Sequence, residues 1–73
     1  MPEFLVEAYR TKPDRAADVA RVAGDGIGHV RSIFVPDDEV SFHLFTGPSL
    51  EALRSALELA GFAFERIAAA EGD

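Results

Sequence analysis

Two side chains that could transfer protons or bind metal stand in segments with the alternation of β-strands. These are His43 and Glu7, each flanked by apolar residues. A carboxylate beside an imidazole orients it and makes it more basic, which suits a general base or a metal ligand. Tyr9 would share a strand face with Glu7, and Arg66 is an available partner for the Glu7 carboxylate. We therefore expect Glu7, Tyr9, His43 and Arg66 to line one binding site.

The other chemical motifs are weaker. His29 is expected to be a solvated residue at the start of a strand. The acidic residues 37–39 lack the spacing of a calcium loop. Residues 24–28 are glycine-rich, but they follow a predicted helix and precede a strand, the reverse of a phosphate loop, so we expect a flexible connection. Because there is no Ser-His-Asp pattern, nucleophile elbow or cysteine, we name no catalytic residue and favour a binding protein over an enzyme.

The elements that would position these residues alternate between strands and helices. Apolar, β-compatible runs predict strands over residues 4–9, 30–35, 40–46 and 64–69. A narrow apolar stripe predicts the first helix, with Pro13 near its first turn and Gly24 after its last. Leucines at helical spacing predict a second helix with Ser49 as N-cap and Gly61 as the C′ residue, followed by Phe62 in a Schellman motif.

The order β-α-β-β-α-β predicts one ferredoxin-like α+β domain over residues 1–73. Right-handed crossovers place both helices on one face of a four-stranded antiparallel sheet, with the first and third strands in its centre. We assign to the helix-covered face Phe4, Val6, Ala8, Val40, Phe42 and Leu44. We assign to the open face Leu5, Glu7, Tyr9, Ser41, His43 and Phe45, with Ser32, Phe34, Phe64 and Arg66 from the edge strands.

The predicted open face is too apolar to be left in water without a function. Sheet-to-sheet packing of two protomers would cover it and form a dimeric α+β barrel. A chain of 73 residues with no cysteine also needs support beyond its own small core, and dimerisation or a metal would supply it. We therefore expect a homodimer.

The charge balance excludes some partners. The net charge is -6, and the chain has one lysine, so the clustered cations that nucleic acid requires are missing. RNA binding through aromatic residues of the open face is disfavoured for the same reason. No apolar run approaches the ~20 residues of a membrane span, and no secretory signal is visible. We expect a cytoplasmic protein that binds neither nucleic acid nor membrane.

Several segments resemble a small bacterial domain of unknown function that has nickel-binding members. They are residues 4–9, 37–45 and 47–54, with Ala60-Gly61 and Arg66-Ile67 after them. The resemblance spans nearly the whole chain and implies a ferredoxin-like fold, a homodimer and, for some members, nickel binding. The family position that matches His43 is often cysteine or histidine, so the resemblance implies His43 as a nickel ligand.

The resulting hypothesis is a homodimeric ferredoxin-like protein whose open sheet face binds a small ligand, nickel or another divalent transition metal. Imidazole and oxygen donors suit nickel but do not select it. One alternative is a cofactor-independent monooxygenase or isomerase of the dimeric α+β barrel type, with His43 as general base. Another is a purely structural or regulatory dimer.

Overall fold

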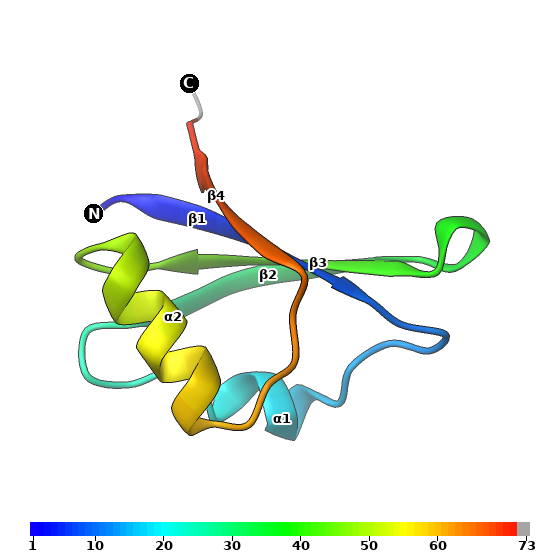
Figure 1. Cartoon of the computed structure of the whole chain (residues 1–73), viewed down its shortest axis with the longest axis horizontal. Coiled ribbons are helices and arrows are strands. Elements are labelled where there is room, and N and C mark those ends of the chain that lie inside the picture. Colours follow the sequence, from blue (N-terminus) through cyan, green and yellow to red (C-terminus); the bar gives the residue numbers. More distant parts are fainter. Residues whose placement is uncertain (72–73) are drawn as a thin grey trace.

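The fold is a four-stranded antiparallel sheet with two helices on one of its faces (Figure 1). The computed structural model describes residues 1–71. Its elements are β1 (Glu3–Tyr9), α1 (Ala16–Ala20), β2 (Gly28–Val35), the 3-10 helix η1 (Pro36–Asp38), β3 (Val40–Thr46), α2 (Leu50–Leu59) and β4 (Arg66–Ala70). The strand order β2-β3-β1-β4 places β1 and β3 in the centre. The predicted ferredoxin-like architecture is confirmed.

Helix α2 begins and ends as its sequence predicts. The Ser49 side chain accepts a hydrogen bond of 3.1 Å from the Ala52 amide, which satisfies one free donor of the first turn. At the other end, Gly61 has a φ of 67°, in the left-handed region. The Phe62 amide then bonds the Leu57 carbonyl at 2.9 Å, the bond that defines a Schellman motif. This motif turns the chain so that the Phe62 ring enters the core.

Helix α1 is shorter than its apolar stripe predicts. It ends at Ala20, and the next two turns are closed by i→i+3 bonds instead of helical ones. The glycine-rich segment after it is a tight turn and not the flexible connection that we predicted. Asp25 and Gly26 both have positive φ, and Gly24 and Ile27 exchange backbone hydrogen bonds of 2.8 and 2.9 Å. Asp-Gly is the sequence that such two-residue turns favour.

The face assignment of β3 is wrong in the sequence prediction. Phe4 lies opposite Phe45 and Val6 lies opposite His43, so His43 and Phe45 lie on the helix-covered face. The residues of β3 that we assigned to that face, Val40, Phe42 and Leu44, lie on the open one. Both sides of β3 are largely apolar, so alternation alone could not choose between them.

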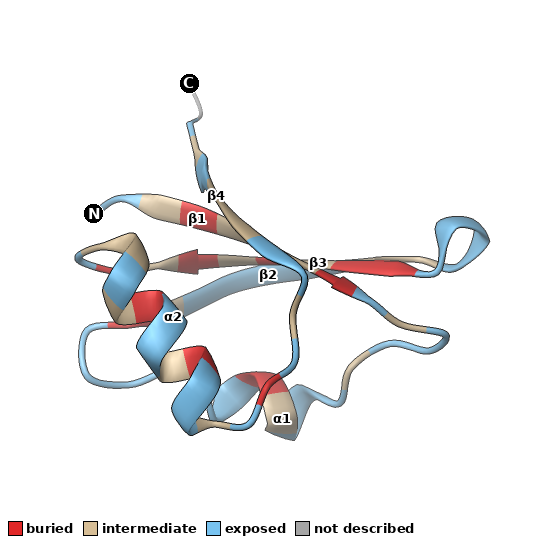
Figure 2. Ribbon diagram, in the orientation of Figure 1, coloured by how far each residue is buried: buried red, intermediate tan, exposed pale blue. Residues whose placement is uncertain are grey.

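The core lies between the helix-covered face and the two helices (Figure 2). Phe45, Val6, Leu53 and Leu57 are fully buried there. Exposure varies along the open face, where Phe42 and Leu44 are half-buried while Ile33 and Tyr9 are exposed. Its apolar residues include Leu5, Ile33, Phe42, Leu44 and Ala68.

The edge strands divide differently from the prediction. A bulge between His29 and Arg31 resets the register of β2, so Ser32 lies opposite His43 on the helix-covered face. Phe34 also faces the helices, and Phe64 lies before β4 and packs against the core. Arg66 lies opposite Glu7 on the open face, as predicted.

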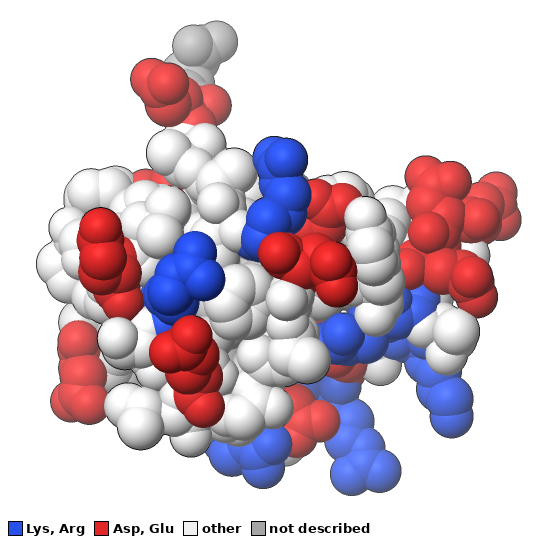
Figure 3. Space-filling model, in the orientation of Figure 1, with Lys and Arg blue, Asp and Glu red and all other residues white. Residues whose placement is uncertain are grey.

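Acidic side chains gather at the far end of the β2–β3 hairpin, over η1 (Figure 3). Asp37, Asp38 and Glu39 are all exposed there. Glu39 ends η1 with a φ of 51°. Within residues 1–71 no helix is long and apolar enough to cross a membrane.

Candidate functional site

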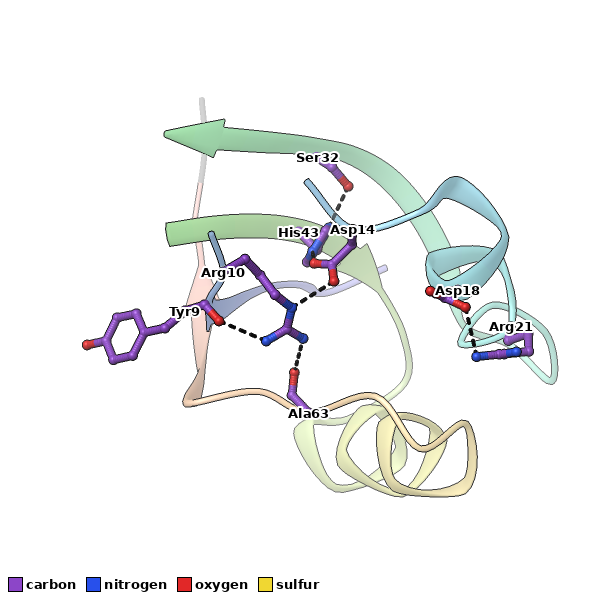
Figure 4. Close-up of polar contacts among 8 residues, drawn as sticks. All are labelled: Tyr9, Arg10, Asp14, Asp18, Arg21, Ser32, His43 and Ala63. Carbon is purple, nitrogen blue, oxygen red and sulfur yellow. Dashed lines mark hydrogen bonds and ion pairs between the residues drawn. The ribbon is translucent and has the colours of Figure 1, made fainter. Parts of the chain in front are cut away.

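A continuous line of hydrogen bonds crosses the helix-covered face of the sheet. Figure 4 shows its Asp14–His43–Ser32 part. The Asp14 Oδ2 atom is 2.8 Å from His43 Nε2, and His43 Nδ1 is 2.6 Å from Ser32 Oγ. The same hydroxyl is 2.7 Å from His29 Nε2. Asp14 comes from the loop before α1, Ser32 and His29 from β2, and His43 from β3. Three segments that are distant in sequence therefore supply one polar cluster.

Arg10 holds the acidic end of this line in place. Its Nε–H donates to Asp14 Oδ1 at 2.7 Å, and a second nitrogen donates to the Ala63 carbonyl at 2.5 Å. The guanidinium also lies over the Phe62 ring, 5.4 Å from its centroid, and the His43 ring meets the same phenyl edge-on at 5.4 Å. Arg10 thus fixes the Asp14 loop to the segment that follows α2.

The charge on Asp14 follows from these contacts. Burial raises the pKa of its carboxyl, but hydrogen bonds from Arg10 and His43, and the attraction of their charges, outweigh burial. The net pKa is lowered, so the group is a carboxylate at neutral pH. A carboxylate only accepts hydrogen bonds, so His43 Nε2 must carry a proton and donate it. In the neutral imidazole, Nδ1 is then the acceptor and Ser32 Oγ–H the donor.

The two ends of the cluster differ in their access to solvent. The His43 side chain is 2% exposed, whereas Ser32 and His29 are exposed. A cleft of about 420 Å³ beside α1 is lined by Asp14, His29 and Ser32 together with Ala16, Val19, Ala20 and Ala23. A volume in this range, with apolar walls and a few polar groups, is typical of small-molecule sites. A ligand in this cleft would meet the Ser32 hydroxyl and the His29 imidazole.

The structure does not bring the predicted site residues together. Glu7 lies on the open face, where its carboxylate pairs with Arg66 at 3.3 Å. Tyr9 is 61% exposed, and its ring points away from the cluster (Figure 4). His43 lies on the opposite side of the sheet from both. The expected grouping of His43 with Glu7 and Tyr9 is therefore wrong, because the faces of β3 are exchanged.

The donor groups around His43 do not fit a resident metal. Both of its ring nitrogens are engaged, one by Ser32 and the other by Asp14. In the described part of the chain, no three His, Asp or Glu side chains are grouped as ligands. A general base in an open-face cavity, as the oxygenase alternative requires, is not supported either, since His43 faces the helices.

Sequence reasoning missed Asp14 and Ser32 as members of the site. Asp14 was not singled out as a candidate, and Ser32 was assigned to the open face. The absence of a Ser-His-Asp motif was no guide, because spacing in sequence does not limit which side chains meet in space. One available signal was His43 itself, since an imidazole buried in a strand needs two hydrogen-bond partners.

Comparison with known proteins identifies a structural relative. No family model matches this chain. No curated protein matches it either. The crystal structure of SCO4226 from Streptomyces coelicolor A3(2) superposes with a TM-score of 0.75, at 19% identity, over 97% of this chain and 98% of that one. At this identity the match shows a shared fold and nothing about a ligand. The resemblance to nickel-binding members stays a prediction.

Proposed function

We propose that this protein is a small binding domain that takes a mostly apolar molecule with one carbonyl group into the cleft beside α1. The observation that carries the proposal is the hydrogen-bond line that ends at the cleft. His29 and Ser32 present polar atoms there, while four small or branched apolar side chains of α1 and its neighbourhood form the wall. The carbonyl oxygen of a ligand would accept from His29 Nε2–H in place of Ser32 Oγ, because the Ser32 proton is donated to His43.

Rigidity supports this role. Ser32 is held by His43, which Asp14 and Arg10 hold in turn, so little side-chain freedom is lost when a ligand binds. The apolar wall gives affinity through burial, and the few fixed polar atoms give orientation. For a fragment-sized ligand we expect a dissociation constant on the order of 1 mM, which is a binding free energy of about -4 kcal/mol.

The test is a two-dimensional NMR screen of small esters, amides and ketones against the full chain. We expect amide shifts in α1 and in β2 around Ser32, and the Ala20→Phe variant, whose ring would fill the cleft, to weaken binding about tenfold or more. Ala17→Phe is the matched control, because Ala17 is exposed on α1 but does not line the cleft. Shifts confined to the open sheet face, or equal losses in both variants, would refute the cleft as the site.

We also propose that two copies pair through their open faces to form a dimeric α+β barrel. The support is an apolar sheet surface that includes Leu44, Phe42 and Ile33, the last 47% exposed. Sedimentation at micromolar concentration should report a dimer, and Leu44→Asp should shift it to monomer because a charge would be buried in the interface. A wild-type monomer under these conditions would remove this part of the proposal.

Nickel or another divalent transition metal is a second candidate ligand on the sequence resemblance alone, because both ring nitrogens of His43 are engaged in hydrogen bonds. Binding would require His43 to release Ser32 or Asp14. Calorimetric titration of nickel into wild type and His43→Ala decides this. Equal heats would exclude His43 as a ligand.

A further inference from the structure

Ser32 stands at the boundary of two hollows. The larger is the cleft beside α1, and a smaller one of about 130 Å³ lies on its other side. Both are lined by Ser32 and Asp14, and the smaller is also lined by Pro13, Phe34, Ser41 and His43. Since one water occupies about 30 Å³ in the liquid, the smaller hollow has room for a small acyl group. A molecule lying across Ser32 could therefore place one part in each hollow.

The proton on Ser32 already points toward a base. Asp14 is ionised and accepts from His43 Nε2–H, which leaves His43 Nδ1 to accept from the Ser32 hydroxyl at 2.6 Å. A hydroxyl bonded to an imidazole that a carboxylate orients is the arrangement that activates serine nucleophiles. In serine proteases the hydroxyl bonds to Nε2 of the histidine and the carboxylate to Nδ1. Here the two nitrogens are exchanged, because the hydroxyl bonds to Nδ1 and the carboxylate to Nε2. Arg10 and Asp14 act as positioning residues.

Each hollow has one donor for negative charge on a carbonyl oxygen, which is His29 in the cleft, once it leaves Ser32 Oγ, and Ser41 in the smaller hollow. His29 Nε2 is 2.7 Å from Ser32 Oγ, close to where an attacked carbonyl would lie. Ser41 is 1% exposed and lines the smaller hollow, and within residues 1–71 its hydroxyl is a buried polar group with no hydrogen-bond partner. A buried hydroxyl without a partner is costly unless a bound group satisfies it. An oxyanion in the smaller hollow would do so.

We propose that Ser32 is a nucleophile that accepts the acyl group of small activated carboxylic esters. This proposal depends on the proposed function only in that the leaving group of the ester would bind in the cleft. Ser32 Oγ would bond to the ester carbonyl carbon while its proton passes to His43 Nδ1. The bond from that carbon to the ester oxygen breaks, and the leaving oxygen takes the proton from His43. In the second step a water oxygen bonds to the acyl carbon while its proton passes to His43 Nδ1. The bond from that carbon to Ser32 Oγ breaks, the carboxylic acid leaves, and Oγ takes the proton back from His43.

The experiment treats the full chain with p-nitrophenyl acetate at neutral pH. It follows nitrophenolate release and locates the acetyl group by peptide mass spectrometry. We expect one acetyl group on Ser32, none there in Ser32→Ala, and a rate about a hundredfold lower in His43→Gln, in line with the usual contribution of a general base. Ser55→Ala is the matched control, because Ser55 is exposed on α2 and lines neither hollow, and it should react like wild type.

Because His43→Gln could unfold the chain, Asp14→Glu and Asp14→Asn provide a second comparison. A positioning carboxylate predicts partial rescue of the acetylation rate by Glu but not by Asn, at matched folded fractions measured by circular dichroism. Acetylation only on Lys12, on the terminal amine or on His29 would overturn the nucleophile. So would a Ser32 acetylation rate that His43→Gln leaves unchanged in a folded protein.

The two proposals fail separately. Fragments that bind in the cleft without acetylation of Ser32 would retain the binding function and remove the nucleophile. Acetylation of Ser32 in an Ala20→Phe chain that no longer binds fragments would retain the nucleophile and remove the cleft as the seat of the leaving group.

Discussion

Replacing Asp14 with alanine should lower the free energy of unfolding by about 3 kcal/mol, because Arg10 and His43 would lose the carboxylate that they donate to. The Asp14 carboxylate, 11% exposed, accepts from both Arg10 and the buried His43. Without it, the His43 Nε2–H has no acceptor inside the protein. A chain of 73 residues has a total stability on the order of 4–11 kcal/mol, so this loss would be a large fraction of it. Urea unfolding followed by circular dichroism measures the change.

Asp18 supplies the matched control. It also pairs with an arginine, Arg21, at 2.9 Å, but the two side chains are 41% and 65% exposed. Exposed pairs of this kind contribute about 0–1 kcal/mol, so Asp18→Ala should be close to neutral. Equal losses of unfolding free energy in Asp14→Ala and Asp18→Ala would show that the buried cluster stabilises the fold no more than an exposed ion pair does.

The same residue predicts how stability depends on pH. The pKa of Asp14 is lower in the folded chain than in the unfolded one, where it is about 3.9. Its contribution is therefore complete above that value and disappears as the pH falls through the folded pKa. The stability curves of wild type and Asp14→Asn should differ at neutral pH and converge only as the pH falls below the lowered pKa of Asp14 in the folded chain. Parallel curves throughout would contradict the lowered pKa.

The second large effect is expected for Phe45→Ala, at about 3–5 kcal/mol. Phe45 is 0% exposed, lies opposite Phe4 in the centre of the sheet and belongs to the core cluster. Truncation removes its buried surface and leaves a cavity that the neighbouring strands cannot close. Unfolding in urea, at the lowest protein concentration that gives a signal, should show a strongly destabilised chain.

Phe42→Ala is the informative comparison, because which of the two variants loses more stability depends on which face of β3 is turned toward the helices. Phe42 lies on the open face and is half-buried, so its truncation should cost clearly less than that of Phe45 when dimerisation is minimal. The face assignment made from the sequence, with Phe42 toward the helices, predicts the opposite order. A larger loss in Phe42→Ala than in Phe45→Ala would mean that β3 is in fact turned the other way.

The ends of α2 show which features of the fold could be predicted from the sequence, and the two phenylalanines of β3 show which could not. The limits of α2 were predictable because Ser49, Gly61 and Phe62 act through contacts within a few residues of the helix ends. The order of the strands and helices followed from local patterns in the same way. The face that β3 presents to the helices depends on pairing with distant strands, and both of its faces carry large apolar side chains.

The candidate site could not be predicted for a related reason. Asp14, Ser32 and His43 are far apart in sequence, and only the sheet register with the bulge in β2 brings them together. That bulge exchanges the faces of the residues before and after it, so alternation counted from His29 misplaces Ser32 unless the bulge is known. The length of α1 mattered as well, because a longer helix would change the cleft beside it.

The most direct test of the account is the state of the His43 imidazole, measured by long-range proton–nitrogen NMR at mildly alkaline pH. The hydrogen-bond line predicts a neutral ring with its proton on Nε2, protected from solvent exchange, and an Nδ1 signal that shifts in Ser32→Ala. A proton on Nδ1, or a ring that exchanges as freely as an exposed histidine, would contradict it.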